Sequence, residues 1–180
     1  MNTETHIGYT QLNVVGKRWR ALYFGTVGAV AGFLASIAIL GSDVIVARFM
    51  GFSPFMLLRY YATIREGSTA LLMSSWTFFL NAFVMHMAVG SALGAVFVLI
   101  VSGHPAFQRW DRYVGAGIAF GLTVWIVNFY LLLSWIQPLI NGRAYILESI
   151  PWWVGAGTHA IYGLTLAVVS YSFRNDVEQD

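Results

Sequence analysis

Four long apolar segments dominate the sequence. They cover about 21–41, 76–103, 113–138 and 152–173, and the second and third contain no Asp, Glu, Lys or Arg. A helix needs about 20 apolar residues to cross the roughly 30 Å of hydrocarbon in a bilayer. The runs are continuous and lack the two-residue alternation of a membrane β-barrel. The sequence therefore predicts an all-α integral membrane protein, a four-helix bundle that forms a single transmembrane domain over 1–180.

The composition also indicates that lipid surrounds most of the chain. Hydrophobic residues make up 58% of the chain and charged residues 10%, against about 25% charged in soluble domains. The ten Lys and Arg are scattered between the apolar segments, whereas a nucleic-acid partner would need them gathered on one face. The chain has no Cys, which excludes disulfides, iron–sulfur clusters and thiolate-bound metals.

Basic residues in the flanks indicate the orientation of the segments. With four crossings, the two termini and the middle loop share one side of the membrane. That side holds six basic residues, Lys17, Arg18, Arg20, Arg109, Arg112 and Arg174, and the other holds four, Arg48, Arg59, Arg65 and Arg143. This favours cytoplasmic termini. The polar start, 1–16, does not resemble a cleaved signal peptide, so the first segment is expected to remain.

The segment 44–72, between the first two spans, is unusual for a loop. Its sequence is too apolar for a solvated connection, and Gly51 and Pro54 interrupt it too often for a crossing. We expect an interfacial or re-entrant segment that lies against the bundle.

Small residues recur at four-residue spacing in a repeated pattern. Both the second and the fourth span read small-xxx-His-xxx-Gly-xxx-small, as Ala82, His86, Gly90, Gly94 and as Gly155, His159, Gly163, Ala167. The first and third spans carry related stripes, Gly28, Gly32, Ser36 and Gly117, Gly121. Residues at this spacing share one helix face, and small ones let helices approach closely in lipid. The pattern predicts two helical hairpins related by a parallel repeat, with Gly28, Gly32, Gly90, Gly94, Gly117, Gly121, Gly155 and Gly163 as the packing residues.

His86 and His159 are the histidines inside the spans, where ionisable groups are costly and often functional. One interpretation is that the two imidazoles meet and hold a haem b or a metal, or relay protons. The favoured one is that each neutral ring hydrogen-bonds a facing carbonyl or hydroxyl, such as Ser91 or Thr158, with no cofactor. No metal site is predicted, because two histidines without a neighbouring carboxylate fall short of an ordinary ligand set.

Asn81 and Asn128 are further polar residues inside the spans. Asparagine at this depth usually bonds across helices, and lining a pore is the alternative. No Ser-His-Asp, Walker-type or HExxH motif occurs, so enzymatic catalysis is not expected.

Two stretches resemble a known family. They are GIAFGLTVWIVNFYLLLSWIQP, from Gly117 to Pro138, and HAIYGLTLAVV, from His159 to Val169. They are similar to the YagU-like group of small bacterial membrane proteins of unknown function, which share four helices and a His-x-x-Tyr-Gly motif in the last. The resemblance implies a bacterial inner-membrane location and supplies no reaction. The second span departs from the motif, with Val89 in place of the tyrosine.

The sequence favours a non-catalytic accessory or structural subunit. Such a subunit would pack against other integral membrane subunits of a larger complex, such as a respiratory one, with 44–72 as the docking surface. Two alternatives stay open. One is a haem b-binding electron-transfer or quinone-associated protein that uses His86 and His159, and the other is a homo-oligomeric channel.

Overall fold

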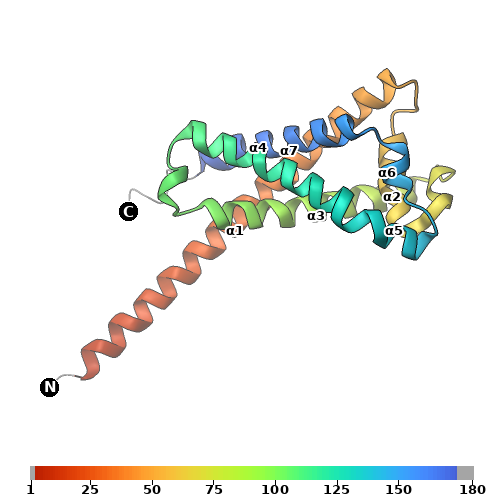
Figure 1. Ribbon diagram of the computed structural model, residues 1–180. Coiled ribbons are helices and arrows are strands. Elements are labelled where there is room, and N and C mark those ends of the chain that lie inside the picture. The colour runs from red at the N-terminus through yellow and green to blue at the C-terminus, as the bar shows by residue number, and fades with distance from the viewer. Residues whose placement is uncertain (1–2, 174–180) are drawn as a thin grey trace.

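The computed structural model describes residues 3–173, with the side chains of 3–15 and 17 left aside, and every regular element in that range is a helix. The predicted all-α fold is therefore confirmed. Figure 1 shows long helices running back and forth, with short helices gathered at one end. The long ones are α1 (Thr3–Phe49), α3 (Trp76–Val101), α4 (Trp110–Ile126) and α7 (Trp152–Ser172). The shorter ones are α2 (Met56–Glu66), η1 (Gly67–Leu71), η2 (Pro105–Phe107), η3 (Val127–Leu133), α5 (Ser134–Asn141) and α6 (Tyr145–Ser149).

Within the described range, three helices are long and apolar enough to cross a membrane. They are Arg18–Phe49, Trp76–Val101 and the continuous run Trp110–Asn141, which joins α4, η3 and α5. Large apolar side chains on them are uncovered, for example Leu22, Ile100 and Leu131 at 61%, 63% and 61% exposure. Lipid tails solvate such side chains without penalty. These helices correspond to the first three predicted spans. The fourth, α7, has 21 residues, about 30 Å of helix at 1.5 Å per residue.

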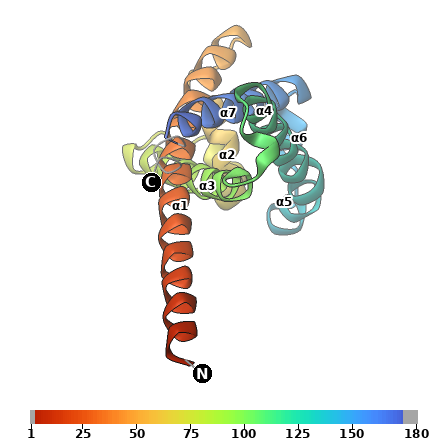
Figure 2. The ribbon, with the colours of Figure 1, turned by 90° about the vertical axis from the view of Figure 1, so that its left-hand side faces the viewer.

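Helix α1 extends into the segment 44–72 that the sequence predicts to be interfacial. Helix α1 continues without a break to Phe49, so 44–49 belongs to the first long helix. Gly41 does not end it, because a helix in lipid keeps its backbone hydrogen bonds and one glycine costs only about 1 kcal/mol. The chain turns instead at Gly51, with φ of 77°, and then forms α2 and η1. The N-terminal part of α1 extends away from the other helices (Figure 2).

Helices α1 and α3 form one hairpin, and their backbones touch at glycines. A Cβ added to Gly94 would lie 2.6 Å from the Cα of Gly32, and one added to Gly28 would lie 2.7 Å from the Cα of Ala95. Gly90 lies beside Gly32 and Ser36 in the same seam. No side chain larger than hydrogen fits between these backbones.

Helices α4 and α7 form the second hairpin in the same way. A Cβ added to Gly163 would lie 2.7 Å from the carbonyl carbon of Gly117, and Gly121 meets the backbone of His159. Gly155 differs from the other seven packing glycines. A Cβ there would lie 2.5 Å from Nε1 of Trp125, so this glycine makes room for an indole ring rather than for a helix backbone.

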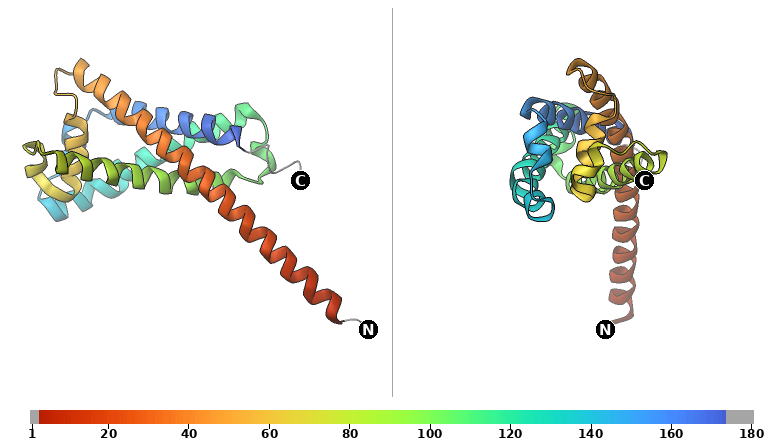
Figure 3. Two further views of the ribbon diagram at one scale, coloured as in Figure 1. Left: turned by 180° about the vertical axis from the view of Figure 1, so that it is seen from behind. Right: turned by 90° about the vertical axis from the view of Figure 1, so that its right-hand side faces the viewer.

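The two hairpins contact each other mainly through α1 and α7. Helix α1 crosses α7 and packs against it (Figure 3), whereas α3 and α4 approach each other less and meet through aromatic rings such as Phe97 and Phe120. Near that turn, Phe24, Phe97, Tyr113 and Leu166 belong to one buried apolar cluster. The bundle is thus filled at the η2 end, and the space between the hairpins lies toward α2 and α6.

Gly94→Ala should destabilise the protein, because the added methyl group forces α1 and α3 apart. Overpacking of this kind costs about 1–3 kcal/mol. Gly115→Ala is the matched control, since nothing lies within 4 Å of its Cβ position in α4, and alanine favours the helix by about 1 kcal/mol. Thermal unfolding in mild detergent, followed by tryptophan fluorescence, should show a lower midpoint for Gly94→Ala only. Equal losses in both variants would contradict the packing argument.

Candidate functional site: a cavity between the hairpins

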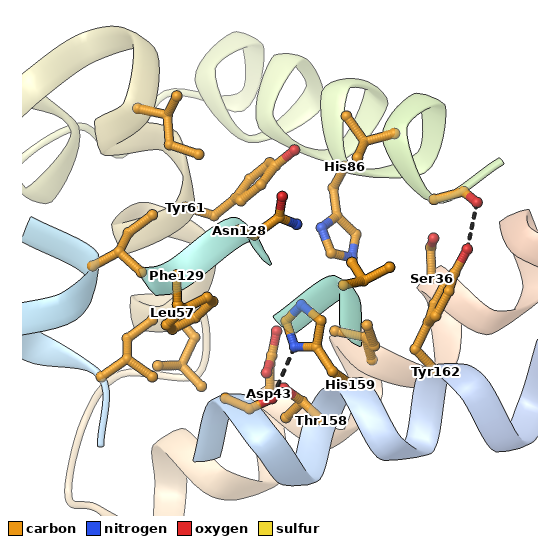
Figure 4. A pocket seen from close by; sticks show the side chains of 18 of the residues that line it. Ser36, Asp43, Leu57, Tyr61, His86, Asn128, Phe129, Thr158, His159 and Tyr162 are labelled. Atoms are coloured by element: carbon orange, nitrogen blue, oxygen red, sulfur yellow. Dashed lines mark hydrogen bonds between the residues drawn. The ribbon is translucent and has the colours of Figure 1, made fainter. Parts of the chain in front are cut away.

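A cavity of about 440 Å³ lies between the two hairpins, on the side of α2 and α6. Helices α1, α2, α3, α6, α7 and the run from α4 to α5 all contribute to its wall. Most lining side chains are Leu, Ile, Val and Met, and none is Lys or Arg. The polar lining residues are Ser36, Asp43, Tyr61, His86, Asn128, Thr158, His159 and Tyr162 (Figure 4).

The structure brings His86 and His159 to the same cavity from opposite hairpins. Their rings point into it from α3 and α7 (Figure 4). Nδ1 of His159 lies 2.8 Å from the carbonyl oxygen of Gly155 in its own helix. A carbonyl can only accept, so Nδ1 carries the proton and Nε2 offers a lone pair. The partner of His159 is thus one turn away on α7, and not on a facing helix.

His86 is held differently. Its ring packs edge-on against Tyr61 of α2, with centroids 5.2 Å apart. Its Nε2 is buried and makes no hydrogen bond of ordinary geometry to the described residues, although the backbone of Ser36 interacts with the ring. A buried polar atom without a partner is uncommon in a folded protein and is often explained by function or by a bound molecule. Nε of Arg59 and Nε1 of Trp125 are in the same state, and of these three residues only His86 lines the cavity.

Asp43 is a cavity residue that the sequence analysis missed. It lies on α1 one residue before the predicted interfacial segment and lines the same cavity as the two histidines (Figure 4). Among the described residues it takes part in none of the ion pairs. The signal was present in the sequence, because Asp43 is a lone acidic residue followed by the apolar run from Val44 to Ala47.

Asn128 lines the cavity from the π-helix η3, whereas Asn81 does not line it. The wider turns of η3 bring both Asn128 and Phe129 to the cavity wall, and Phe129 packs edge-on against His159 with centroids 5.8 Å apart. Single π-turns inside longer helices occur frequently at functional sites. Asn81 is exposed and borders a smaller crevice between α2 and α3.

One buried amide holds together the helices at this end of the bundle. Nε2 of Gln137 in α5 donates to Oγ1 of Thr63 in α2 over 2.8 Å, and Oε1 accepts from the backbone N–H of Ile146 in α6 over 3.1 Å. Nδ2 of Asn141 adds a bond to the carbonyl of Thr63 at 2.9 Å. These contacts fix α2 and α6 over the cavity.

Tyr61 reaches the cavity from α2, outside the three long apolar helices. Burial raises the pKa of its phenol above the ordinary value, because a phenolate loses its hydration there. The hydroxyl therefore stays protonated around neutral pH and can donate a hydrogen bond into the cavity.

Neither a metal nor a haem fits the lining residues well. In the described range no three His, Cys, Asp or Glu side chains are close enough to hold a metal ion. Haem b carries two propionates, which usually pair with cationic side chains, and no Lys or Arg lines this cavity. The lining instead suits a neutral molecule.

No family model, curated protein or solved structure matches the chain. The resemblance to the YagU-like group stays a prediction, and the function has to be argued from the cavity.

Gln137→Leu should lower the unfolding midpoint, because the N–H of Ile146 loses its partner in a buried place. An unsatisfied buried donor costs about 1–3 kcal/mol. Gln108→Leu, at an exposed position next to η2, makes the same chemical change without breaking a buried bond. The comparison uses thermal unfolding in detergent, and equal midpoints for the two variants would mean that the amide does not hold α2, α5 and α6 together.

Proposed function

We propose that this protein binds a neutral lipophilic molecule with a polar ring as its head group, of the quinone class, in the cavity between its hairpins. The observation that carries the proposal is the meeting of His86 and His159 in one cavity with Asp43, and with no cationic side chain. Ligand sites are typically apolar clefts with a few convergent polar groups, of about 300–1,000 Å³, and this cavity has that form.

The chemistry of the lining supports a ring and argues against an anionic head group. Tyr61, Phe129 and Tyr162 offer aromatic faces and edges to a flat molecule. Phosphate and carboxylate groups are usually bound by Arg or Lys, and neither lines the cavity. A cavity among lipid-facing helices also favours a ligand that arrives dissolved in the bilayer.

We also propose that α7 is a fourth crossing, with both termini in the cytoplasm of a bacterium and the chain in its inner membrane. The length of α7 and its glycine contacts with α4 support the crossing. The excess of basic residues near the termini supports the orientation.

The topology can be tested with single cysteines, because the chain has none of its own. Gln108→Cys, Ser172→Cys and Ser68→Cys each place a thiol at an exposed position. An impermeant maleimide added outside intact cells should label only Ser68→Cys, and all three should react after the membrane is opened. Labelling of Ser172→Cys from outside while Gln108→Cys stays protected would show that α7 does not cross, and labelling of both would show the reverse orientation.

Binding can be measured with decylubiquinone on protein reconstituted without native lipid. A ligand that binds only the folded state raises the unfolding midpoint with its concentration, so decylubiquinone should stabilise the unaltered protein. His86→Ala with His159→Ala should abolish the shift. His104→Ala, which removes an exposed histidine beside η2, should leave it intact.

The same preparation separates the two cofactor interpretations. A Soret band in the purified protein that disappears in the double histidine variant would favour haem b and contradict the quinone proposal. The absence of any shift with both decylubiquinone and its reduced form, decylubiquinol, would count against it equally.

The accessory-subunit function stays a prediction, and size analysis after gentle solubilisation addresses it. A lone 20.0 kDa chain in its detergent micelle would argue against a larger complex. For the channel alternative, Asn128 lines a cavity inside one chain, which favours a role in that cavity over a pore between protomers.

A further inference from the structure

Three hydroxyl groups of the cavity wall, those of Ser36, Thr158 and Tyr162, already use their protons in hydrogen bonds to the protein backbone. Each donates to a backbone carbonyl of a long helix, so its oxygen can only accept a further hydrogen bond. The three bonds run from Ser36 to Gly32 (2.9 Å), from Thr158 to Val154 (3.0 Å) and from Tyr162 to Gly90 (2.6 Å).

His159 belongs to the same group of acceptors. Its Nδ1–H donates to the carbonyl of Gly155 at 2.8 Å, so the neutral ring has only the lone pair of Nε2 left to offer. Asp43 lines the same cavity from α1, and its carboxyl group can accept hydrogen bonds there. Acceptors from α1 and α7 are thus concentrated on one side of the cavity.

Free donors are fewer. The hydroxyl of Tyr61 and the amide N–H groups of Asn128 can donate into the cavity, and the tautomer of His86 decides whether its Nε2 donates or accepts. A ligand in this cavity has to supply hydrogen-bond donors to the acceptors of the wall, because a buried acceptor without a donor is costly. The cavity therefore favours a head group that carries hydrogen-bond donors.

We infer that this cavity selects the reduced, dihydroxy form of a quinone-class ligand over its oxidised, dioxo form. The inference rests on the proposed function and adds the redox state of the bound molecule. A quinol presents two O–H donors, which match the acceptor wall formed by His159 and Asp43. A quinone presents two carbonyl oxygens, which face the lone pairs of these groups. A site built around a hydroxyl rejects analogues that lack it.

The test compares decylubiquinol with decylubiquinone under anaerobic conditions on the reconstituted protein. Each is titrated against thermal unfolding, and the two are competed against one another. We expect the quinol to bind at least about tenfold more tightly. Equal affinities, or tighter quinone binding, would overturn this inference and leave the proposed function standing. Binding of neither form would overturn the proposed function itself.

Two substitutions at one position isolate the acceptor. In His159→Asn the amide N–H takes the place of Nδ1–H and can keep the bond to Gly155, but nothing replaces Nε2. In His159→Gln the amide reaches the position of Nε2, and its oxygen can accept. The preference for quinol should fall toward parity in His159→Asn and be largely retained in His159→Gln. An unchanged preference in His159→Asn would overturn the assignment of His159.

Asp43→Asn provides a second variant that does not depend on α7. At pH 9, where the Asp43 carboxyl is ionised and can only accept, the substitution replaces one acceptor oxygen by an N–H donor at nearly constant size, so the ratio of quinol to quinone affinity should fall. Unliganded unfolding midpoints identify any variant that has lost its fold. A ratio that stays the same in a folded Asp43→Asn protein would contradict the acceptor wall.

Discussion

Direct contact between glycine backbones is the interaction on which the rest of this structure depends. In lipid, two helices gain nothing by hiding leucine from each other, so their association relies on close van der Waals packing and on hydrogen bonds between helices. The seams of Gly28 with Gly94 and of Gly117 with Gly163 provide that packing. They also fix the rotation of each helix, and so determine which residues face the interior. His86 and His159, each four residues before a seam glycine, face it for this reason.

The cavity exists because the same seams do not continue to the end of the bundle. Toward α2 and α6 the small residues give way to imidazole rings, and the hairpins separate around them. Tyr162 bridges the hairpins at the edge of this space through its bond to the carbonyl of Gly90. The corresponding residue of the first hairpin is Val89, which cannot make such a bond. The two hairpins therefore differ at the cavity. The second hairpin has a hydrogen-bonding tyrosine at this position, and the first has an apolar valine.

The sequence predicted the features that depend on local periodicity. A four-residue spacing of glycines is visible in one helix alone, and so is the length of an apolar run, which is why the long helices and their seams could be located. Features that depend on contacts between distant segments were missed. Asp43 reaches the cavity only because α1 passes Gly41 unbroken, and the role of Gln137 requires α2 and α6 to lie against α5. The π-helix at Val127–Leu133 has no spacing signature that the amino-acid pattern reveals.

A purely structural role for the two histidines leaves one atom unexplained. A histidine kept only for packing would have both ring nitrogens hydrogen-bonded within the protein, and the bond to Gly155 satisfies one nitrogen of His159. His86 differs, because its buried Nε2 makes no hydrogen bond of ordinary geometry to the described part of the chain. An unpaired polar atom is costly in a low-dielectric interior. The ring of His86 also packs edge-on against Tyr61, which restricts its rotation. Under the proposed function, a molecule in the cavity would supply this partner and so stabilise the folded protein.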